Sequence, residues 1–183
     1  MKTIEKTVAV GASKLLAVEL QTKLPTAATW SDTTATSATV LIYAVGEDTV
    51  GTVDAGSTTS AVADAARTEA TDFWNGMPLT FQDGDNVGLT RIISDFVSGT
   101  LTLDVAGAAL VAAPATGDQY VIRGYPIVSK VAVSPSGNTV SYQITAVNGG
   151  TSVAREVMVV FALSYTNGGN TDIEYCQFRV NVE

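Results

Sequence analysis

Apolar and polar residues alternate along much of the chain with a period of two, which is the pattern of a strand with one buried face. In 139–147, for example, Val140, Tyr142 and Ile144 fall on one side and Ser141 and Gln143 on the other. Comparable runs occur near both ends of the sequence. The pattern predicts seven strands, near residues 3–10, 14–22, 37–46, 127–134, 138–147, 153–165 and 172–182.

Short segments rich in Asn and Gly separate the later runs, at 136–138, 148–150 and 167–169. These residues tolerate positive φ and suit tight turns between antiparallel strands. From Ile127 onward we therefore expect four consecutive antiparallel strands. Together with the three earlier strands they predict an all-β chain containing a seven-stranded antiparallel β-sandwich, Ig-like or jelly-roll-like.

Helical propensity is concentrated in the alanine-rich segment 61–71. Val62 is almost its only apolar residue beyond alanine, so a helix there would have little to bury. A short helix and a strand followed by a loop both remain open for this segment.

The middle of the chain, residues 50–124, has shorter apolar runs and a fixed order of punctuating residues. In sequence these are Trp74 and Gly76, Gly84 and Gly88, Arg91 and Ile93, and then Pro114, Gly117 and Asp118. This order resembles a small β-barrel module that recurs in the tail, fibre and head proteins of bacteriophages. The matching residues are scaffold residues, so the resemblance implies a fold and a setting but no active site.

The resemblance implies that 50–124 is a small β-barrel inserted into a sandwich made of 1–49 and 125–183. Insertion between strands is tolerated where the ends of the insert lie close together. Arg91 would cross the outer face of the barrel toward Asp95 or Asp118, which contributes at most about 1 kcal/mol when exposed. The barrel interior is expected to hold Trp74, Phe81, Ile93, Phe96, Leu101, Leu103, Tyr120 and Ile122.

Charge, hydropathy and cysteine content limit the partners and the cellular compartment that we expect for the chain. The chain has 10 Lys and Arg against 18 Asp and Glu, with no basic cluster, which argues against a nucleic-acid partner. No apolar run approaches the roughly 20 residues that span a bilayer, so no membrane segment is expected. A start without an apolar signal region and a lone Cys176 fit synthesis in a reducing cytoplasm.

The sequence offers little reactive chemistry. Histidine is absent, which removes Ser-His and Cys-His nucleophile systems, so we expect no catalytic residue, no cofactor and no enzyme. Asp83 and Asp85 could bind calcium, but they lack the spaced ligands of an EF-hand, and a plain turn is favoured. Cys176 is expected to be a buried structural thiol, and 11–14 a turn rather than a phosphate loop. The scattered Trp and Tyr residues favour core packing over a sugar-binding platform.

The expected function is that of a bacteriophage virion structural protein, most favourably a capsid decoration or cement protein that stabilises the head shell. Its partners would be the major capsid protein or other virion proteins, and it would form a homo-oligomer, with a trimer favoured. Its location would be the virion, assembled in the host cytoplasm. The alternatives are a tail, adaptor or fibre-base subunit, and a carbohydrate-binding or adhesive module.

The N-terminal segment 1–10 has two interpretations. It is either the first strand of its own sandwich or an arm that adds a strand to the sheet edge of a neighbouring subunit.

Overall fold

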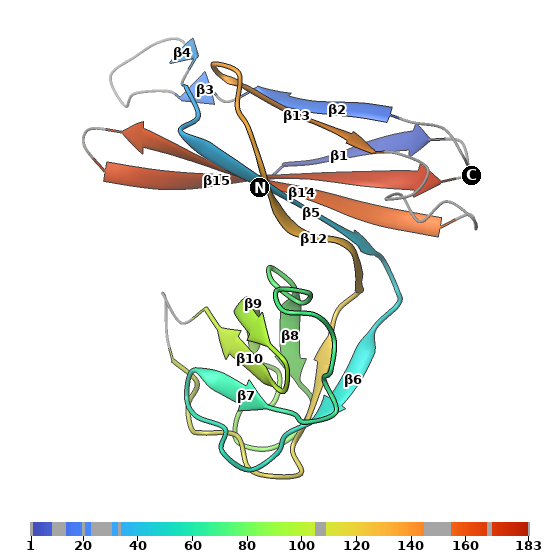
Figure 1. The fold of residues 1–183 in the computed structure, drawn as a ribbon, viewed down its shortest axis with the longest axis vertical. Coiled ribbons are helices and arrows are strands. Elements are labelled where there is room, and N and C mark those ends of the chain that lie inside the picture. Colours follow the sequence, from blue (N-terminus) through green and yellow to red (C-terminus); the bar gives the residue numbers. More distant parts are fainter. Residues whose placement is uncertain are drawn as a thin grey trace. The chain divides into compact units, whose positions relative to one another are not determined.

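The fold consists of strands joined by turns and loops. The computed structural model describes residues 2–8, 14–19, 21–22, 31–32, 34–104, 109–144, 155–167 and 170–182. Every regular element in these ranges is a β-strand, which confirms the predicted all-β class (Figure 1). The chain divides into two compact units, one made of Met1–Ile42 with Val131–Glu183 and the other of Tyr43–Lys130.

The first unit is built around a five-stranded sheet with the strand order β1-β15-β14-β5-β12. Its strands are β1 Lys2–Val8, β15 Asn170–Val182, β14 Arg155–Asn167, β5 Ser37–Ala44 and β12 Tyr125–Val133. The end of β5 and the first part of β12, up to Lys130, already belong to the second unit. Two smaller antiparallel pairs join β13 Thr139–Ile144 to β2 Lys14–Glu19 and β3 Gln21–Thr22 to β4 Ser31–Asp32. Each of the seven predicted strand segments therefore overlaps an observed strand, and segment 14–22 holds two short ones, β2 and β3.

The pairing of these strands differs from the expected run of four consecutive antiparallel strands. Of that run, β14 and β15 form a hairpin, whereas β12 lies beside β5 and β13 pairs with β2. In addition, β1 runs parallel to β15, with Lys2 opposite Cys176 and Val8 opposite Val182. The all-antiparallel expectation is wrong at β1 because a period of two is the same in parallel and antiparallel strands and does not identify the partner.

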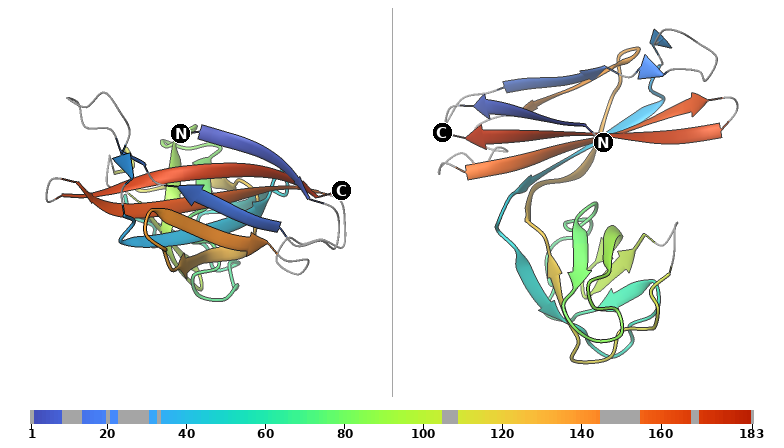
Figure 2. Two further views of the ribbon diagram at one scale, coloured as in Figure 1. Left: turned by 90° about the horizontal axis from the view of Figure 1, so that it is seen from above. Right: turned by 180° about the vertical axis from the view of Figure 1, so that it is seen from behind.

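The core of this unit packs against the five-stranded sheet. Val40 and Ile42 of β5 are buried. Their strand lies between β14 and β12, and both of these neighbours come from the flanking segment 125–183 that was predicted to pair with 1–49. Figures 1 and 2 show β2 and β13 lying over one face of the sheet. The buried apolar side chains of β13, β14 and β15 are Val140, Val157, Met158, Val159, Phe161, Leu163 and Val180.

The second unit holds a curled six-stranded sheet with the order β6-β11-β8-β9-β10-β7, seen from both sides in Figures 1 and 2. Every neighbouring pair in it is antiparallel. Its strands are β6 Thr49–Thr52, β7 Ala61–Ala63, β8 Pro78–Phe81, β9 Thr90–Val97, β10 Thr100–Leu103 and β11 Gln119–Ile122.

Residues 61–71 form a strand and a loop rather than a helix. Ala61–Ala63 make up β7, and the chain then continues through turns. Val62 is fully buried opposite Leu101 of β10. A three-residue strand can pack against a core with one inward-facing apolar side chain, and Val62 supplies it. A helix would need several apolar residues along one side to pack against the same core, and this segment lacks them.

The core of the second unit contains all eight residues that were expected to fill its interior, from Trp74 to Ile122, and each is buried. Met77, Leu79, Val53 and Val62 are buried with them. Two polar side chains, Asp64 and Asn86, are also buried, and both take part in the interactions described next.

Candidate functional site

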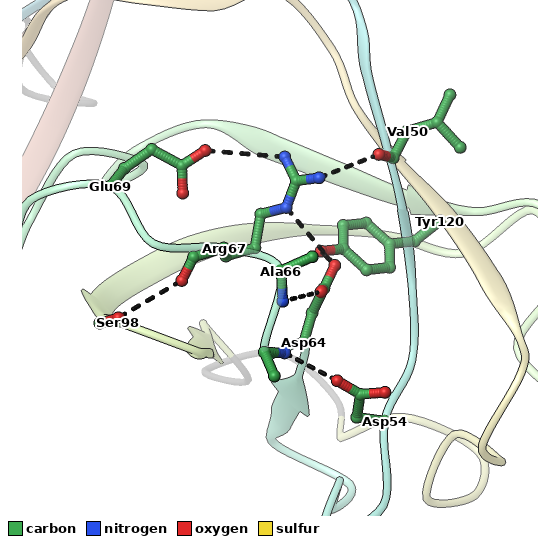
Figure 3. A network of polar contacts seen from close by, with 9 residues as sticks. Val50, Asp54, Asp64, Ala66, Arg67, Glu69, Ser98 and Tyr120 are labelled. Atoms are coloured by element: carbon green, nitrogen blue, oxygen red, sulfur yellow. Dashed lines mark hydrogen bonds and ion pairs between the residues drawn. The ribbon is translucent and has the colours of Figure 1, made fainter.

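The most concentrated polar chemistry in the second unit surrounds a buried pair, Asp64 and Tyr120 (Figure 3). Asp64 follows β7, and Tyr120 lies in β11. The phenolic O–H of Tyr120 donates to Oδ2 of Asp64 at 2.6 Å. The other carboxylate oxygen, Oδ1, accepts the backbone N–H of Ala66 at 2.9 Å. Both carboxylate oxygens therefore have partners, as burial requires.

Arg67 supplies the positive charge of this cluster. Its Nε lies 3.4 Å from Oδ2 of Asp64, and its Nη1 lies 3.7 Å from Oε1 of Glu69. The contact with Asp64 is an ion pair without a directed hydrogen bond, because Nε has no hydrogen-bond partner. Nη2 does donate a hydrogen bond, to the carbonyl of Val50 at 3.2 Å. The guanidinium thus neutralises buried charge and also ties the loop to a strand.

These contacts connect the two edges of the curled sheet. Asp64 and Arg67 follow β7, which is one edge strand, whereas Val50 belongs to β6, the other edge strand. The backbone N–H of Asp54 donates to the carbonyl of Ala63 at 2.7 Å, and Oδ2 of Asp54 accepts the N–H of Ala65 at 2.7 Å. Hydrogen bonds from side chains and from the backbone therefore connect the segment after β7 to β6 and to the residues that follow it, which brings the two edges of the sheet together.

Gly51 makes room for this cluster. It lies opposite Tyr120 in the pairing of β6 with β11. A Cβ at this position would overlap the Tyr120 ring and would lie 2.7 Å from Oδ2 of Asp64. The Tyr120–Asp64 hydrogen bond therefore requires a glycine on the facing strand, since no side chain fits beneath it.

Burial raises the pKa of Tyr120, and its hydrogen bond to the Asp64 carboxylate raises that pKa further. Both causes favour the neutral phenol over the phenolate. Tyr120 therefore stays a hydrogen-bond donor at neutral pH, and the arrangement can hold two strands together but does not generate a nucleophile.

A second polar contact joins the segment that precedes β6 to the segment that follows β11. Oδ2 of Asp48 accepts a hydrogen bond from Arg123 Nη1 at 2.6 Å, and Oδ1 accepts the N–H of Gly124 at 2.9 Å. Burial acts to raise the pKa of Asp48, but the hydrogen bonds from Arg123 and Gly124 and the charge of Arg123 outweigh it and lower that pKa. The segment entering β6 is thus fastened to the segment leaving β11.

Of the two residues that were considered as calcium ligands, Asp83 binds a backbone group instead. Oδ1 of Asp83 accepts the N–H of Gln119 at 2.6 Å, and Asp85 is exposed in the same turn. The buried Asn86 donates to the carbonyl of Ala112 at 3.0 Å and accepts the N–H of Val111 at 3.0 Å. Within the described residues no group of three or more acidic, Cys or His side chains is placed to hold a metal ion.

The remaining sequence candidates are placed as follows. Cys176 is half-buried rather than buried as expected, and it lies where β1 begins to pair with β15. Of segment 11–14, only Lys14, the first residue of β2, is among the described residues. Arg91 donates to the carbonyls of Thr90 and Ala109 at 2.9 and 3.3 Å.

Trp74 is fully buried and packs edge-on against Phe73 and Tyr125, with ring centroids 4.9 and 5.8 Å away. This placement favours core packing over a sugar platform for Trp74. Sequence reasoning missed the Asp64 cluster altogether. The signal it could have used is a single acidic residue directly after the short apolar run at 61–63.

No protein-family model and no curated protein matches the chain. None of the described segments forms a helix long and apolar enough to cross a membrane.

Proposed function

We propose that the chain is a structural subunit of a bacteriophage particle, and most favourably a capsid decoration or cement protein that binds the major capsid protein. In this proposal the strands of the first unit form a sandwich. The curled sheet of the second unit is a small inserted barrel, closed by the contacts around Asp64. The subunit acts by binding neighbours rather than by catalysing a reaction.

The observation that carries the proposal is the contact between two residues of the phage-like pattern, Gly84 and Asp118. Gly84 has a φ of 70°, and a Cβ there would overlap the Asp118 carboxylate. Oδ2 of Asp118 in turn accepts the N–H of Ala115 at 2.9 Å within the preceding turn. Residues that punctuate the sequence far apart therefore meet in space, which supports the view that their order encodes one folded module.

The chemistry of the second unit also supports a structural role. The Asp64 carboxylate has a hydrogen-bond partner on each oxygen, and the phenol of Tyr120 is held in its protonated form. A group used in this way stabilises a fold and is not poised to react. Such a protein acts through its surface, and repeated copies in a symmetric shell make a homo-oligomer, with a trimer favoured.

Mass spectrometry of purified phage particles, with heads and tails separated, tests this function. A decoration protein is expected in the head fraction in a stoichiometric amount relative to the major capsid protein. Recovery in the tail fraction would support the tail, adaptor or fibre-base alternative. Absence from both fractions would contradict a virion role.

A carbohydrate-binding or adhesive role is the second candidate, because one aromatic ring of the Trp74 cluster reaches the surface. Tyr125 is 42% exposed and packs against Phe73 with ring centroids 5.4 Å apart. Exposed aromatic rings of this kind can stack on sugar rings. A glycan array in which wild-type protein binds and Tyr125→Ala does not would support adhesion, whereas an array with no binding would exclude it for the glycans presented.

A further inference from the structure

Where the structure describes the side chains of the first unit, the exposed large apolar ones lie on two strands. Among its described residues these are Val131 of β12 and Ile173 and Tyr175 of β15, with exposed fractions of 38%, 54% and 48%. Both strands offer backbone that no described strand pairs with. The coincidence of unpaired backbone and exposed apolar side chains is the mark of a strand-pairing surface.

The open part of β15 is its first half. The pairing of β1 with β15 begins with Lys2 opposite Cys176 and continues to Val182. The outer edge of Asn170–Tyr175 therefore extends beyond β1, which begins partway along the β14–β15 hairpin in Figure 1. The inner edge of these residues is paired with β14 throughout.

The open edge of β12 lies at the other side of the same sheet. β12 is the last strand in the order β1-β15-β14-β5-β12, so its outer edge has no partner strand among the described residues. Lys130, Val131 and Ala132 are exposed one after another there. Three consecutive exposed residues in a strand mean that neither of its faces is covered at that point.

Charge decides which edges match. Residues 170–175 include Asp172 and Glu174 and no basic residue, whereas Lys130 is the sole charged residue of β12. Pairing two copies of this acidic edge with each other would be electrostatically unfavourable. A symmetric antiparallel pairing centred on Ile173 would set Asp172 opposite Glu174, and like charges directly opposite destabilise a sheet.

We propose that β12 of one copy pairs with the first half of β15 of a second copy, so that the five-stranded sheet continues from subunit to subunit. In the antiparallel register that sets Lys130 opposite Glu174, Val131 comes opposite Ile173 and Ser129 opposite Tyr175. The charges are complementary, and the exposed apolar side chains on the two edges meet on one face. Such a contact joins different surfaces of the two copies, so it builds a ring where the rotation closes.

This inference rests on the proposed assembly role and names the surface that carries it. The test is an exchange of charges, made with the full-length protein and sedimentation velocity over a range of concentrations. Lys130→Glu and Glu174→Lys each place like charges opposite each other and are expected to weaken self-association about tenfold. The double variant restores opposite charges and is expected to return to within about threefold of wild type.

Two further variants keep the test decisive. Asp95→Lys reverses an exposed charge on β9, which lies between β8 and β10 and so has no open edge, and it is expected to associate like wild type. Ile173→Thr keeps a β-branched side chain and is expected to weaken association several-fold without lowering the melting temperature, should either charge variant fold poorly.

The proposal is overturned if the single charge variants associate like wild type, if the double variant is no better than either single, or if wild-type protein stays monomeric up to about 1 mM. These results are independent of particle composition. If the protein is found in virions but the charge variants associate like wild type, the proposed function is retained and the pairing of β12 with β15 is rejected. If association depends on these charges but the protein is absent from virions, the pairing is retained and the virion role is rejected.

Discussion

The phenolic oxygen of Tyr120 lies 2.6 Å from a carboxylate oxygen of Asp64, and this hydrogen bond joins residues separated by 56 positions in the sequence. Asp64 follows one edge strand of the curled sheet, and Tyr120 lies on the strand beside the opposite edge. The bond is buried, so neither partner can exchange it for water at no cost. It is therefore expected to contribute more than an exposed polar contact.

Replacing Tyr120 with Phe is expected to lower the free energy of unfolding by about 1–3 kcal/mol. The ring remains, but one carboxylate oxygen of Asp64 loses its donor while still buried. Urea denaturation measures the loss. Tyr125→Phe is the matched control, since that side chain is 42% exposed, and a comparable loss in the control would contradict a special role for the buried bond.

Gly51→Ala is expected to lower the free energy of unfolding by about 1–3 kcal/mol through overpacking. The added methyl group would overlap the Tyr120 ring and crowd the Asp64 carboxylate. Thr52→Ala, at the next and exposed position of the same strand, is expected to change stability by less than about 0.5 kcal/mol. Equal melting temperatures for Gly51→Ala and wild type would mean that Tyr120 can move aside.

Trp74→Ala is expected to lower the free energy of unfolding by roughly 3–5 kcal/mol, because the ring is fully buried among Phe73, Tyr125 and the core of the second unit. Val111→Ala, at a side chain that is largely exposed, serves as the control. Chemical denaturation compares the two. A loss below about 1 kcal/mol for Trp74→Ala would be inconsistent with a buried packing role.

How far the sequence predicts this molecule can be seen by comparing Ile93 with Asp64. Ile93 was expected in the interior of the middle segment together with seven other large apolar or aromatic residues, because side chains of this kind gain most from burial. The cluster around Asp64 depends on residues from 50 to 120 meeting, and no local pattern encodes that meeting. The same limit applies to β1, whose alternation indicated a strand but not a parallel partner.

Lowering the pH is expected to reduce the stability contributed by Asp48. Its pKa is lowered in the folded protein relative to the ordinary value of 3.8, so its contribution is complete above that value and is lost as the pH falls through the lower, folded pKa. The difference in unfolding free energy between wild type and Asp48→Asn should therefore shrink between about pH 5 and pH 2. Denaturation at a series of pH values measures it, and a difference that stays constant would contradict the assignment.

The N-terminal strand provides the last prediction. β1 pairs with β15 from Cys176 to Val182 in a parallel register, and it is the edge strand of the five-stranded sheet. If it belongs to its own subunit, deleting residues 2–8 should lower the melting temperature, because the outer edge of β15 from Cys176 to Val182 loses its partner strand while β14 stays paired with the inner edge. A synthetic peptide with the sequence of residues 2–8 should then restore part of the lost stability, whereas a scrambled peptide should not.

If β1 serves instead as an arm for a neighbour, the truncated protein should keep its melting temperature but lose its oligomer or its attachment to the particle. A truncated protein that is both as stable and as fully assembled as wild type would exclude both roles, because main-chain pairing along a whole strand cannot be removed without effect on whichever sheet it extends.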